Sequence, residues 1–426
     1  MNRNTFLGTL GVGVLLTLMC IVHQQEANSI DSNRSSTLSS RDAANQTITQ
    51  NLTHMSQLAN SSNRFGFNLF AQINSQSPDK NIIISPSSIA IALAMAGNGT
   101  EGKTKEELIE ALELNELDSA AIDNSYQKLM ETLKTADPGV KIAIANSLWA
   151  NQKVTLKEQF VNNAKGFYQA QVSSLNFADF QTKNKINNWV AQNTANKIPE
   201  IVDSVSPQDV LYLINAIYFK GIWTNKFDLN TTTDRPFYRD SNSSSPHPMM
   251  NQTGKYRYHE NDNFQAVRLP YGEQEELGMY IFLPGEDSSL TEFNQLLNGT
   301  NWQEWISQMR SRSGKIAIPR FKLEYETDLI QFLSKLGIER VFAPNLADFS
   351  AMTDIPVAIN KVKHKTFIEV NEEGTEAAAV TSIGIRITSA IREDPPFKMN
   401  VNRPFFFAIR DDITETILFM GNVVEP

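Results

Sequence analysis

The sequence is poor in the residues that cross-link a protein or give it a basic surface. Only one of its 426 residues is cysteine, Cys20, and it lies in an apolar N-terminal run, so the rest of the chain forms no disulfide. Basic residues are outnumbered, with Lys+Arg 38 against Asp+Glu 47 and a net charge of −9. Because no dense cluster of Lys and Arg occurs, we expect neither a nucleic-acid partner nor a polyanion site.

Signatures of catalysis are also missing. The five histidines are scattered without metal-ligand spacing, and no G-x-S-x-G elbow occurs. One motif points the other way: residues 97–104, GNGTEGKT, fit the phosphate-loop pattern G-x-x-x-x-G-K-T. That motif requires a strand just before its first glycine, whereas the sequence predicts a capped helix there. We therefore interpret residues 97–104 as a turn between helices, and we predict no enzyme activity, no metal and no cofactor.

The N-terminal segment differs from the rest of the chain. Residues 5–22 are apolar and predict a signal peptide or an N-terminal anchor over residues 1–27. Cys20 resembles the cysteine of a bacterial lipoprotein signal, although Met19 stands where that signal has a small residue. We expect export to the periplasm or the extracellular space, or attachment to the membrane through this segment. Residues 28–62 are rich in Ser, Asn, Thr and Gln and predict a disordered spacer.

A folded domain is predicted for residues 63–426. Apolar residues at helical spacing begin after Ser62, which is the expected N-cap. Ser85, followed by proline, predicts the N-cap of a second helix, and Thr104 with Glu107 predicts a capping box at the start of a third. Further helices are expected at residues 157–168, 182–193 and 329–336.

Strands dominate the later part of this domain. Apolar alternation or continuous apolar runs predict strands at residues 81–84, 142–150, 171–177, 210–219, 265–269, 279–283, 315–323, 362–370, 405–410 and 416–420. Strands and helices do not alternate regularly, so we predict an α+β fold with large, mostly antiparallel sheets.

A stretch near the C-terminus has an unusual strand pattern. One face of it carries only small or aliphatic side chains, namely Thr375, Ala377, Ala379, Thr381, Ile383, Ile385 and Ile387. Its first half has little bulk and low β propensity. A segment that can form a strand, but is weakly specified as one, suits a loop that changes state.

The residues before and within this stretch, VNEEGTEAAA from Val370 to Ala379, resemble the hinge of the reactive-centre loop in the serpin family. Other segments resemble serpin signatures in the same order along the chain, at residues 81–90 (NIIISPSSIA), 215–223 (NAIYFKGIW), 342–350, 402–407 and 419–421. The resemblance covers residues 63–426 and implies three β-sheets, about nine helices and an exposed reactive-centre loop.

The resemblance also implies two groups of site residues. The loop hinge consists of Glu372, Glu373, Gly374, Thr375, Glu376, Ala377, Ala378 and Ala379. The cluster at which the central sheet opens consists of Ser85, Ser88, Asn215 and His364, with Trp223 at the top of the opening. The alternation of residues 362–370 places His364 on an apolar face, so this cluster would give its ring the buried polar partners that it needs.

Suicide inhibition is the function that the resemblance implies. A serine protease would cleave the loop and form an acyl-enzyme, and insertion of the freed loop into the central sheet would trap it as a covalent complex. The usual family spacing from Glu372 places the reactive bond between Thr388 and Ser389, which suits an elastase-like or subtilisin-like protease. Trypsin-like enzymes would instead cut at the alternatives Arg386–Ile387 or Arg392–Glu393.

A non-inhibitory binding protein on the same fold is the alternative function. Such a protein would carry bulky, charged or proline residues on the face of the hinge that enters the sheet first, whereas that face here holds Thr375, Ala377 and Ala379. The sequence therefore favours an inhibitor, and we expect it to be a monomer in its active state.

Overall fold

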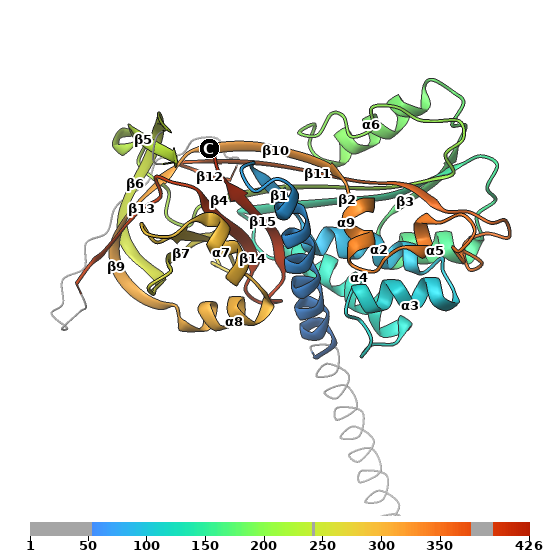
Figure 1. Cartoon of the computed structure of the whole chain (residues 1–426), viewed down its shortest axis with the longest axis horizontal. Helices are drawn as coiled ribbons and strands as arrows, with labels where there is room; N and C mark the ends of the chain where they lie inside the picture. Colours follow the sequence, from blue (N-terminus) through green and yellow to red (C-terminus); the bar gives the residue numbers. More distant parts are fainter. Residues whose placement is uncertain (1–52, 241–242, 376–394) are drawn as a thin grey trace, which may run out of the picture. The chain divides into compact units, whose positions relative to one another are not determined.

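The computed structural model describes residues 53–240, 243–375 and 395–426, and residues 55–426 form one compact unit (Figure 1). The predicted signal peptide or anchor, Cys20 and most of the predicted spacer lie outside the described residues. Within the described ranges, no helix has both the length and the apolar character needed to cross a membrane.

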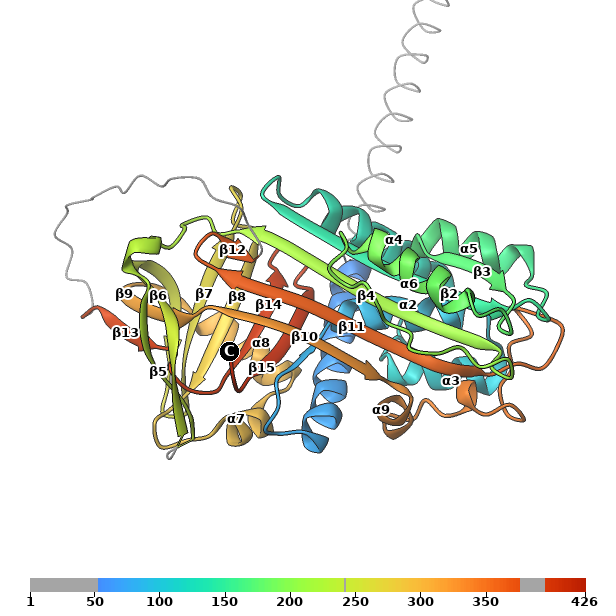
Figure 2. The same cartoon turned by 90° about the horizontal axis from the view of Figure 1, so that it is seen from above.

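The central sheet has six strands (Figure 2). In spatial order they are β10 (Phe321–Asp328), β11 (Ile359–Asn371), β12 (Gly374–Thr375), β4 (Leu211–Ile222), β2 (Val140–Asn151) and β3 (Gln171–Leu175). β4 and β11 are parallel neighbours, paired from Leu211 and Ile359 to Tyr218 and Phe367. We call their boundary the seam. Beyond Tyr218 and Phe367 the two strands separate, and β12 lies between them, antiparallel to both.

The second sheet has nine strands. In spatial order they are β1 (Ile82–Ile84), β15 (Ile417–Val423), β14 (Phe405–Asp411), β8 (Leu277–Pro284), β7 (Phe264–Tyr271), β6 (Ser243–Glu260), β9 (Arg310–Pro319) and β13 (Phe397–Asn400), with β5 (Thr233–Asp240) paired to β6. The long strand β6 pairs with β5, β9 and β7 in turn. Because β6 connects β5, β9 and β7 within one sheet, the described residues form two hydrogen-bonded sheets where three were expected.

Helices cover both faces of the central sheet. Across the described residues, the helices are the helix of residues 53–76, α2 (Pro86–Gly97), α3 (Gly102–Ala111), α4 (Ser119–Thr135), α5 (Glu158–Tyr168), α6 (Thr182–Asn193), α7 (Leu290–Leu296), α8 (Gly299–Gln308) and α9 (Ile330–Lys335), with two 3₁₀ turns, η1 (Leu229–Thr231) and η2 (Arg340–Phe342). These are nine α-helices among the described residues, which agrees with the expected number. In Figure 1, α6 lies on one face of the sheet and α2 to α5 lie on the other.

The apolar core is divided accordingly. The main cluster fills the space between the two sheets and around α2, whose residues are buried along nearly their whole length. A separate cluster lies under α6, where Ile186 and Val190 pack with Trp149, Tyr212 and Phe367 from three strands of the central sheet. The seam between β4 and β11 therefore has apolar side chains on both faces.

The first helix begins earlier than the sequence predicted. Residues 53–62, expected to be spacer, are helical, and Met55, Leu58 and Ala59 are buried. Ser62 lies inside the helix, so its prediction as the N-cap is wrong. Three apolar residues at i, i+3 and i+4 suffice to bury one face of this segment, although its composition is polar.

Two cap predictions had opposite outcomes. Ser85 caps α2 as predicted, because its hydroxyl accepts a hydrogen bond from the Ser88 N–H at 3.4 Å. The capping box at Thr104 and Glu107 is wrong, since α3 begins at Gly102 without a side-chain cap. Glu107 instead accepts the backbone N–H groups of residues 339 and 340, at 3.1 and 2.8 Å.

The stretch at residues 97–104 is a helix–helix turn, as predicted. It connects α2 to α3, and no strand precedes its first glycine. The Thr100 hydroxyl donates to the Gly97 carbonyl at 2.8 Å, and a Cβ added at Gly99 would lie 2.6 Å from Met352. Packing against Met352 explains the glycine without a phosphate.

Candidate functional site

Ser85, Ser88, Asn215 and His364 meet at the seam. His364 on β11 and Asn215 on β4 are register partners, and the His364 Nδ1 atom lies 2.6 Å from Asn215 Oδ1. The backbone N–H of Ser85, just before α2, donates to His364 Nε2 at 3.2 Å. Because Nε2 accepts this hydrogen bond, Nδ1 carries the ring proton and donates it to Asn215. Asn215 Nδ2 donates in turn to the Ser88 carbonyl at 3.0 Å and to the Ser88 hydroxyl.

Burial keeps the His364 ring neutral. The side chain is fully buried, and this desolvation lowers the pKa of His364 to about 3, against a smaller opposing effect of its hydrogen bond to Asn215. A proton on Nε2 would also remove the only acceptor that the ring offers to the Ser85 N–H. The cluster is therefore a polar, uncharged connection across the seam.

Two further residues belong to this cluster and were not predicted. Asn146 on β2 accepts a hydrogen bond from Asn215, and the Thr366 hydroxyl on β11 donates to the Ile83 carbonyl at 2.9 Å. Both residues are buried. Asn146 is a polar residue inside an apolar strand run, and Thr366 shares a strand face with His364; these signals were available in the sequence.

The first residues of the hinge are held by side chains at the open end of the seam. The indole Nε1 of Trp223 donates to the Asn371 carbonyl at 2.9 Å, and its backbone N–H donates to the Glu373 carbonyl at 2.8 Å. The Trp223 ring stacks on Tyr271 with centroids 4.4 Å apart, and the Tyr271 hydroxyl lies 2.6 Å from Thr375 Oγ1. Trp223 therefore lies where β4 and β11 separate.

Gly374 brings the backbone of the hinge close to that of β4. Its φ angle is +153°, and a Cβ placed there would lie 2.0 Å from the Gly221 carbonyl oxygen. Any side chain at this position would push the hinge away from β4, so glycine is required for the contact.

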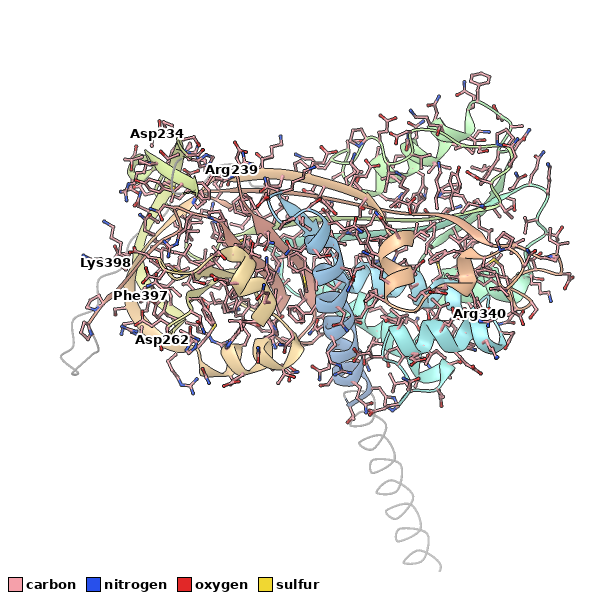
Figure 3. The ribbon with its side chains drawn as sticks, in the orientation of Figure 1. Asp234, Arg239, Asp262, Arg340, Phe397 and Lys398 are labelled. Carbon is pink, nitrogen blue, oxygen red and sulfur yellow. The ribbon has the colours of Figure 1, made fainter. Side chains whose placement is uncertain are left out.

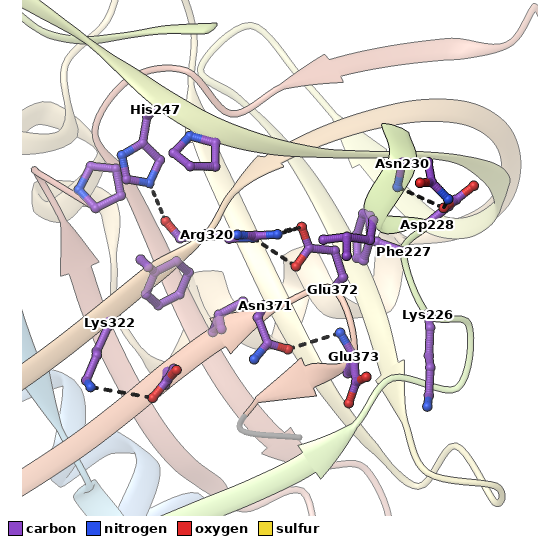
Figure 4. A pocket seen from close by; sticks show the side chains of 16 residues that line it. Lys226, Phe227, Asp228, Asn230, His247, Arg320, Lys322, Asn371, Glu372 and Glu373 are labelled. Atoms are coloured by element: carbon purple, nitrogen blue, oxygen red, sulfur yellow. Dashed lines mark hydrogen bonds and ion pairs between the residues drawn. The ribbon is translucent and has the colours of Figure 1, made fainter. Parts of the chain in front are cut away.

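Glu372 forms an ion pair that the sequence did not reveal. The Arg320 Nε atom lies 2.7 and 2.8 Å from the two carboxylate oxygens of Glu372, and the Thr232 hydroxyl donates to the same carboxylate. Burial opposes ionisation, but the hydrogen bonds from Arg320 and Thr232 outweigh it and lower the pKa of Glu372. The pair lines a cleft of about 1010 Å³ beside the hinge (Figure 4).

The break between β9 and β10 explains why Arg320 was missed. Residues 315–323 were predicted as one strand, but Arg320 separates β9 and β10, which belong to different sheets. A single arginine inside an apolar run was the available signal.

Side chains also fix the position of residues 395–400, where the described part of the chain resumes. Phe397 on β13, labelled in Figure 3, stacks on Tyr258 with ring centroids 3.7 Å apart. The Arg312 guanidinium lies 5.2 Å from the centroid of the Tyr258 ring and donates to the Pro395 carbonyl at 3.2 Å. This stack holds the start of β13 against β6 and β9.

The remaining predicted site residues lie outside the described residues. They are Glu376, Ala377, Ala378 and Ala379 of the hinge, and Thr388, Ser389, Arg386, Ile387, Arg392 and Glu393 of the candidate reactive bonds. Across the residues that are described, no group of three or more His, Cys, Asp or Glu side chains is placed to hold a metal ion.

Comparison with known proteins establishes the family. Residues 60–426 match the family described as Serpin (serine protease inhibitor). The chain is 35% identical over 373 residues to an uncharacterised serpin-like protein of Thermococcus kodakarensis, covering 87% of this chain and 86% of that protein. It is 34% identical over 380 residues to human Serpin B8, covering 87% of this chain and all of Serpin B8. The chain belongs to the serpin family, whose members are protease inhibitors rather than enzymes.

Solved structures agree with this assignment. The native structure of the thermophilic serpin tengpin matches with a TM-score of 0.78 at 31% identity, covering 87% of this chain and 94% of that one. Human thyroxine-binding globulin, complexed with thyroxine, matches with a TM-score of 0.80 at 27% identity, covering 88% and 99%. The α+β fold predicted from the sequence is thus the serpin fold.

Proposed function

We propose that this protein is a suicide inhibitor of serine proteases, whose cleaved loop inserts into the seam between β4 and β11. The supporting observation is β12. Thr375 pairs with Val370 on one side and with Gly221 on the other, and Gly374 pairs with Asn371 and Ile222. The first two residues of an inserted strand are therefore already in place at the open end of the seam. Such insertion is an established example of β-strand addition.

The register of β12 tells where later loop residues would lie after insertion. Thr381 follows Thr375 by six residues, and six residues before Val370 and Gly221 stand His364 and Asn215. Thr381 would thus enter between His364 and Asn215 and replace their hydrogen bond. The strand partners of Thr375 and Thr381 are buried, so the small face of the loop would turn toward the core.

The energetics favour the inserted state. In the same register Ile383 would lie between Val362 and Leu213, and Ile385 would lie beside Leu211, the first residue of β4. Each isoleucine contributes about 1.5–3 kcal/mol if it becomes fully buried. Insertion also pairs the backbone of a whole strand. The native state is then held by a kinetic barrier rather than by the lowest free energy.

The length of the seam bears on the reactive bond. Because Ile385 would pair with Leu211, the first residue of β4, cleavage after Arg386 or Thr388 would leave one or three residues beyond the last pair. Cleavage after Arg392 leaves seven, about 23 Å of extended chain at about 3.3 Å per residue. A linker of that length would separate the protease from the end of the sheet, so insertion would not distort its active site. We therefore propose Thr388–Ser389 as the reactive bond, with Arg386–Ile387 second, and an elastase-like or subtilisin-like protease as the partner.

The alternative is a non-inhibitory binding protein on the same fold, as thyroxine-binding globulin shows that this architecture can bind a small molecule. The hinge of the present chain supports the inhibitor, because Gly374 and Thr375 are small and already paired. We further propose that the protein is exported and meets its protease outside the cytoplasm, which the N-terminal sequence supports. We also propose that it acts as a monomer.

A denaturing gel tests this function. The full chain is mixed with elastase, subtilisin and trypsin in separate reactions, and the released C-terminal peptide is analysed by mass spectrometry. We expect a band that resists boiling near the summed masses, and a peptide that begins at Ser389. Cleavage of the chain with all three proteases still active would refute inhibition of these enzymes and favour the binding protein.

A further inference from the structure

The two ends of the seam are closed in different ways. At the hinge end, β4 and β11 are not paired with each other beyond Tyr218 and Phe367. At the far end, the register shifts between Ile359 and Lys361, so that Asn360 is an extra residue on β11 with no partner of its own on β4. At the far end, therefore, the regular backbone ladder stops, and hydrogen bonds from side chains connect the two strands instead.

Asn360 closes the far end with its side chain. Its Oδ1 atom accepts the backbone N–H groups of Val210 and Leu211, at 2.6 and 3.2 Å, where β4 begins. The neighbouring Lys361 donates to the Ser204 carbonyl at 3.0 Å, and its ammonium lies 4.9 Å from the centroid of the Tyr212 ring. These contacts connect β11 to the start of β4 and to the segment before it.

We propose that Asn360 is a positioning residue that sets the rate of the last step of strand insertion; this rests on the function proposed above. A strand that enters from the hinge end separates β4 from β11 progressively and reaches Asn360 last. At that point the N–H groups of Val210 and Leu211 must leave Oδ1 before they can pair with the incoming strand. Unpaired backbone donors are costly, so this exchange is a barrier to completion but not to the start of insertion.

Peptide annealing tests the proposal without a protease. A synthetic peptide of residues 376–387 is added to the full chain, and its incorporation is followed on native gels. Asn360→Ala should anneal about two to ten times faster than the unaltered chain. The variant lacks the hydrogen bonds that must break, and a barrier lowered by the free energy of a typical hydrogen bond changes a rate by about that factor. Asn360→Asp keeps an acceptor for both N–H groups and should behave like the unaltered chain.

Asn261 provides a matched control. Its Oδ1 atom likewise accepts two backbone N–H groups, those of Asn263 and Phe264 at 2.9 and 3.1 Å, in an exposed turn on the other sheet. Asn261→Ala should leave peptide annealing unchanged. Lys361→Met removes the bond to Ser204 and should also speed annealing, which provides a second test if Asn360→Ala does not fold.

Protease trapping separates this proposal from the function itself. Asn360→Ala should need fewer inhibitor molecules per protease trapped, with the rate of the first encounter unchanged. Equal or slower peptide annealing in Asn360→Ala, or faster annealing in Asn261→Ala, would overturn the role of Asn360. Faster annealing in Asn360→Ala with no protease trapped by any variant would instead refute the inhibitory function and leave the role of Asn360 standing.

Discussion

Acidification should weaken the native fold through His364. Burial lowers the pKa of this ring to about 3 in the folded protein, whereas an unfolded histidine has a pKa of about 6.5. Between these values the unfolded chain binds more protons, so stability rises with pH across this window. The contribution is fully present above pH 6.5 and is lost progressively as the pH falls. At pH 5 the loss amounts to about 2 kcal/mol.

This figure depends chiefly on the unfolded pKa. Any folded pKa below about 4 gives nearly the same loss at pH 5, because the folded ring stays neutral there. His259 also has a lowered pKa, through partial burial, and carboxyl groups begin to titrate near pH 5. Those groups remain in the His364→Gln variant, so the difference between the two proteins isolates His364.

Urea unfolding of the full chain and of His364→Gln at pH 8, 7, 6 and 5 measures the effect. The unaltered chain should lose about 2 kcal/mol more than the variant between pH 8 and pH 5. Parallel pH dependence of the two proteins would refute the reasoning. If His364→Gln does not fold, carbon NMR of the imidazole in the unaltered chain decides, since a ring that titrates near pH 6.5 would contradict its neutral, buried state.

Three other changes have expected outcomes. Under the proposed function, Thr375→Arg should turn the protein from an inhibitor into a substrate on the denaturing gel, because Thr375 is fully buried and a charged side chain cannot enter there. Glu372→Ala should lower the free energy of unfolding, measured in urea, by about 1–2 kcal/mol, because Arg320 loses its partner. The loss is no larger because the Arg320 side chain is 38% exposed and water can solvate its charge. Starting the chain at residue 63 rather than 53 should cost about 2–4 kcal/mol in the same assay, mainly through the buried Leu58.

Each of these changes has its own control. Lys185→Ala, which removes a surface contact of 3.3 Å to Asp179, should change stability by less than about 0.5 kcal/mol, and a loss as large as that of Glu372→Ala would speak against the Glu372 pair. A covalent band that survives Thr375→Arg would show that the hinge tolerates charge. Equal stability of the two truncated chains would mean that residues 53–62 do not contribute to the folded unit.

Strand patterns carried most of the prediction. A nearly continuous apolar run located β4, an alternating run located β11, and that alternation placed the His364 ring on the buried face. These strands are buried within the sheet, so the periodicity of their apolar residues is enough to predict which side chains are buried. The seam contacts of Ser85 and Asn215 lie far apart in sequence and could be expected only through the family resemblance.

The failures have a common physical cause. Met55, Leu58, Glu107 and Arg320 find their partners in segments distant in the chain, and local composition contains no record of those partners. The same holds for α4, α7 and α8, which the sequence analysis did not predict. α4 buries apolar residues such as Leu129 on one face, but its polar composition hid that stripe.

The order of strands in the second sheet has a consequence for biosynthesis. The last strands of the chain, β14 and β15, lie inside that sheet, and β15 pairs with β1, where Ile82 lies opposite Asn422. β2, β3, β4, β10 and β11 of the central sheet are all synthesised before them. Translation at about 5–20 residues per second takes about 3–11 s to reach the C-terminus from Asn371. During that interval β13 has not yet paired with β9, so the folded part of the chain does not hold the segment after Asn371 at its C-terminal end. Under the function proposed above, β13 to β15 must therefore pair soon after their synthesis, so that the uncleaved loop stays out of the seam.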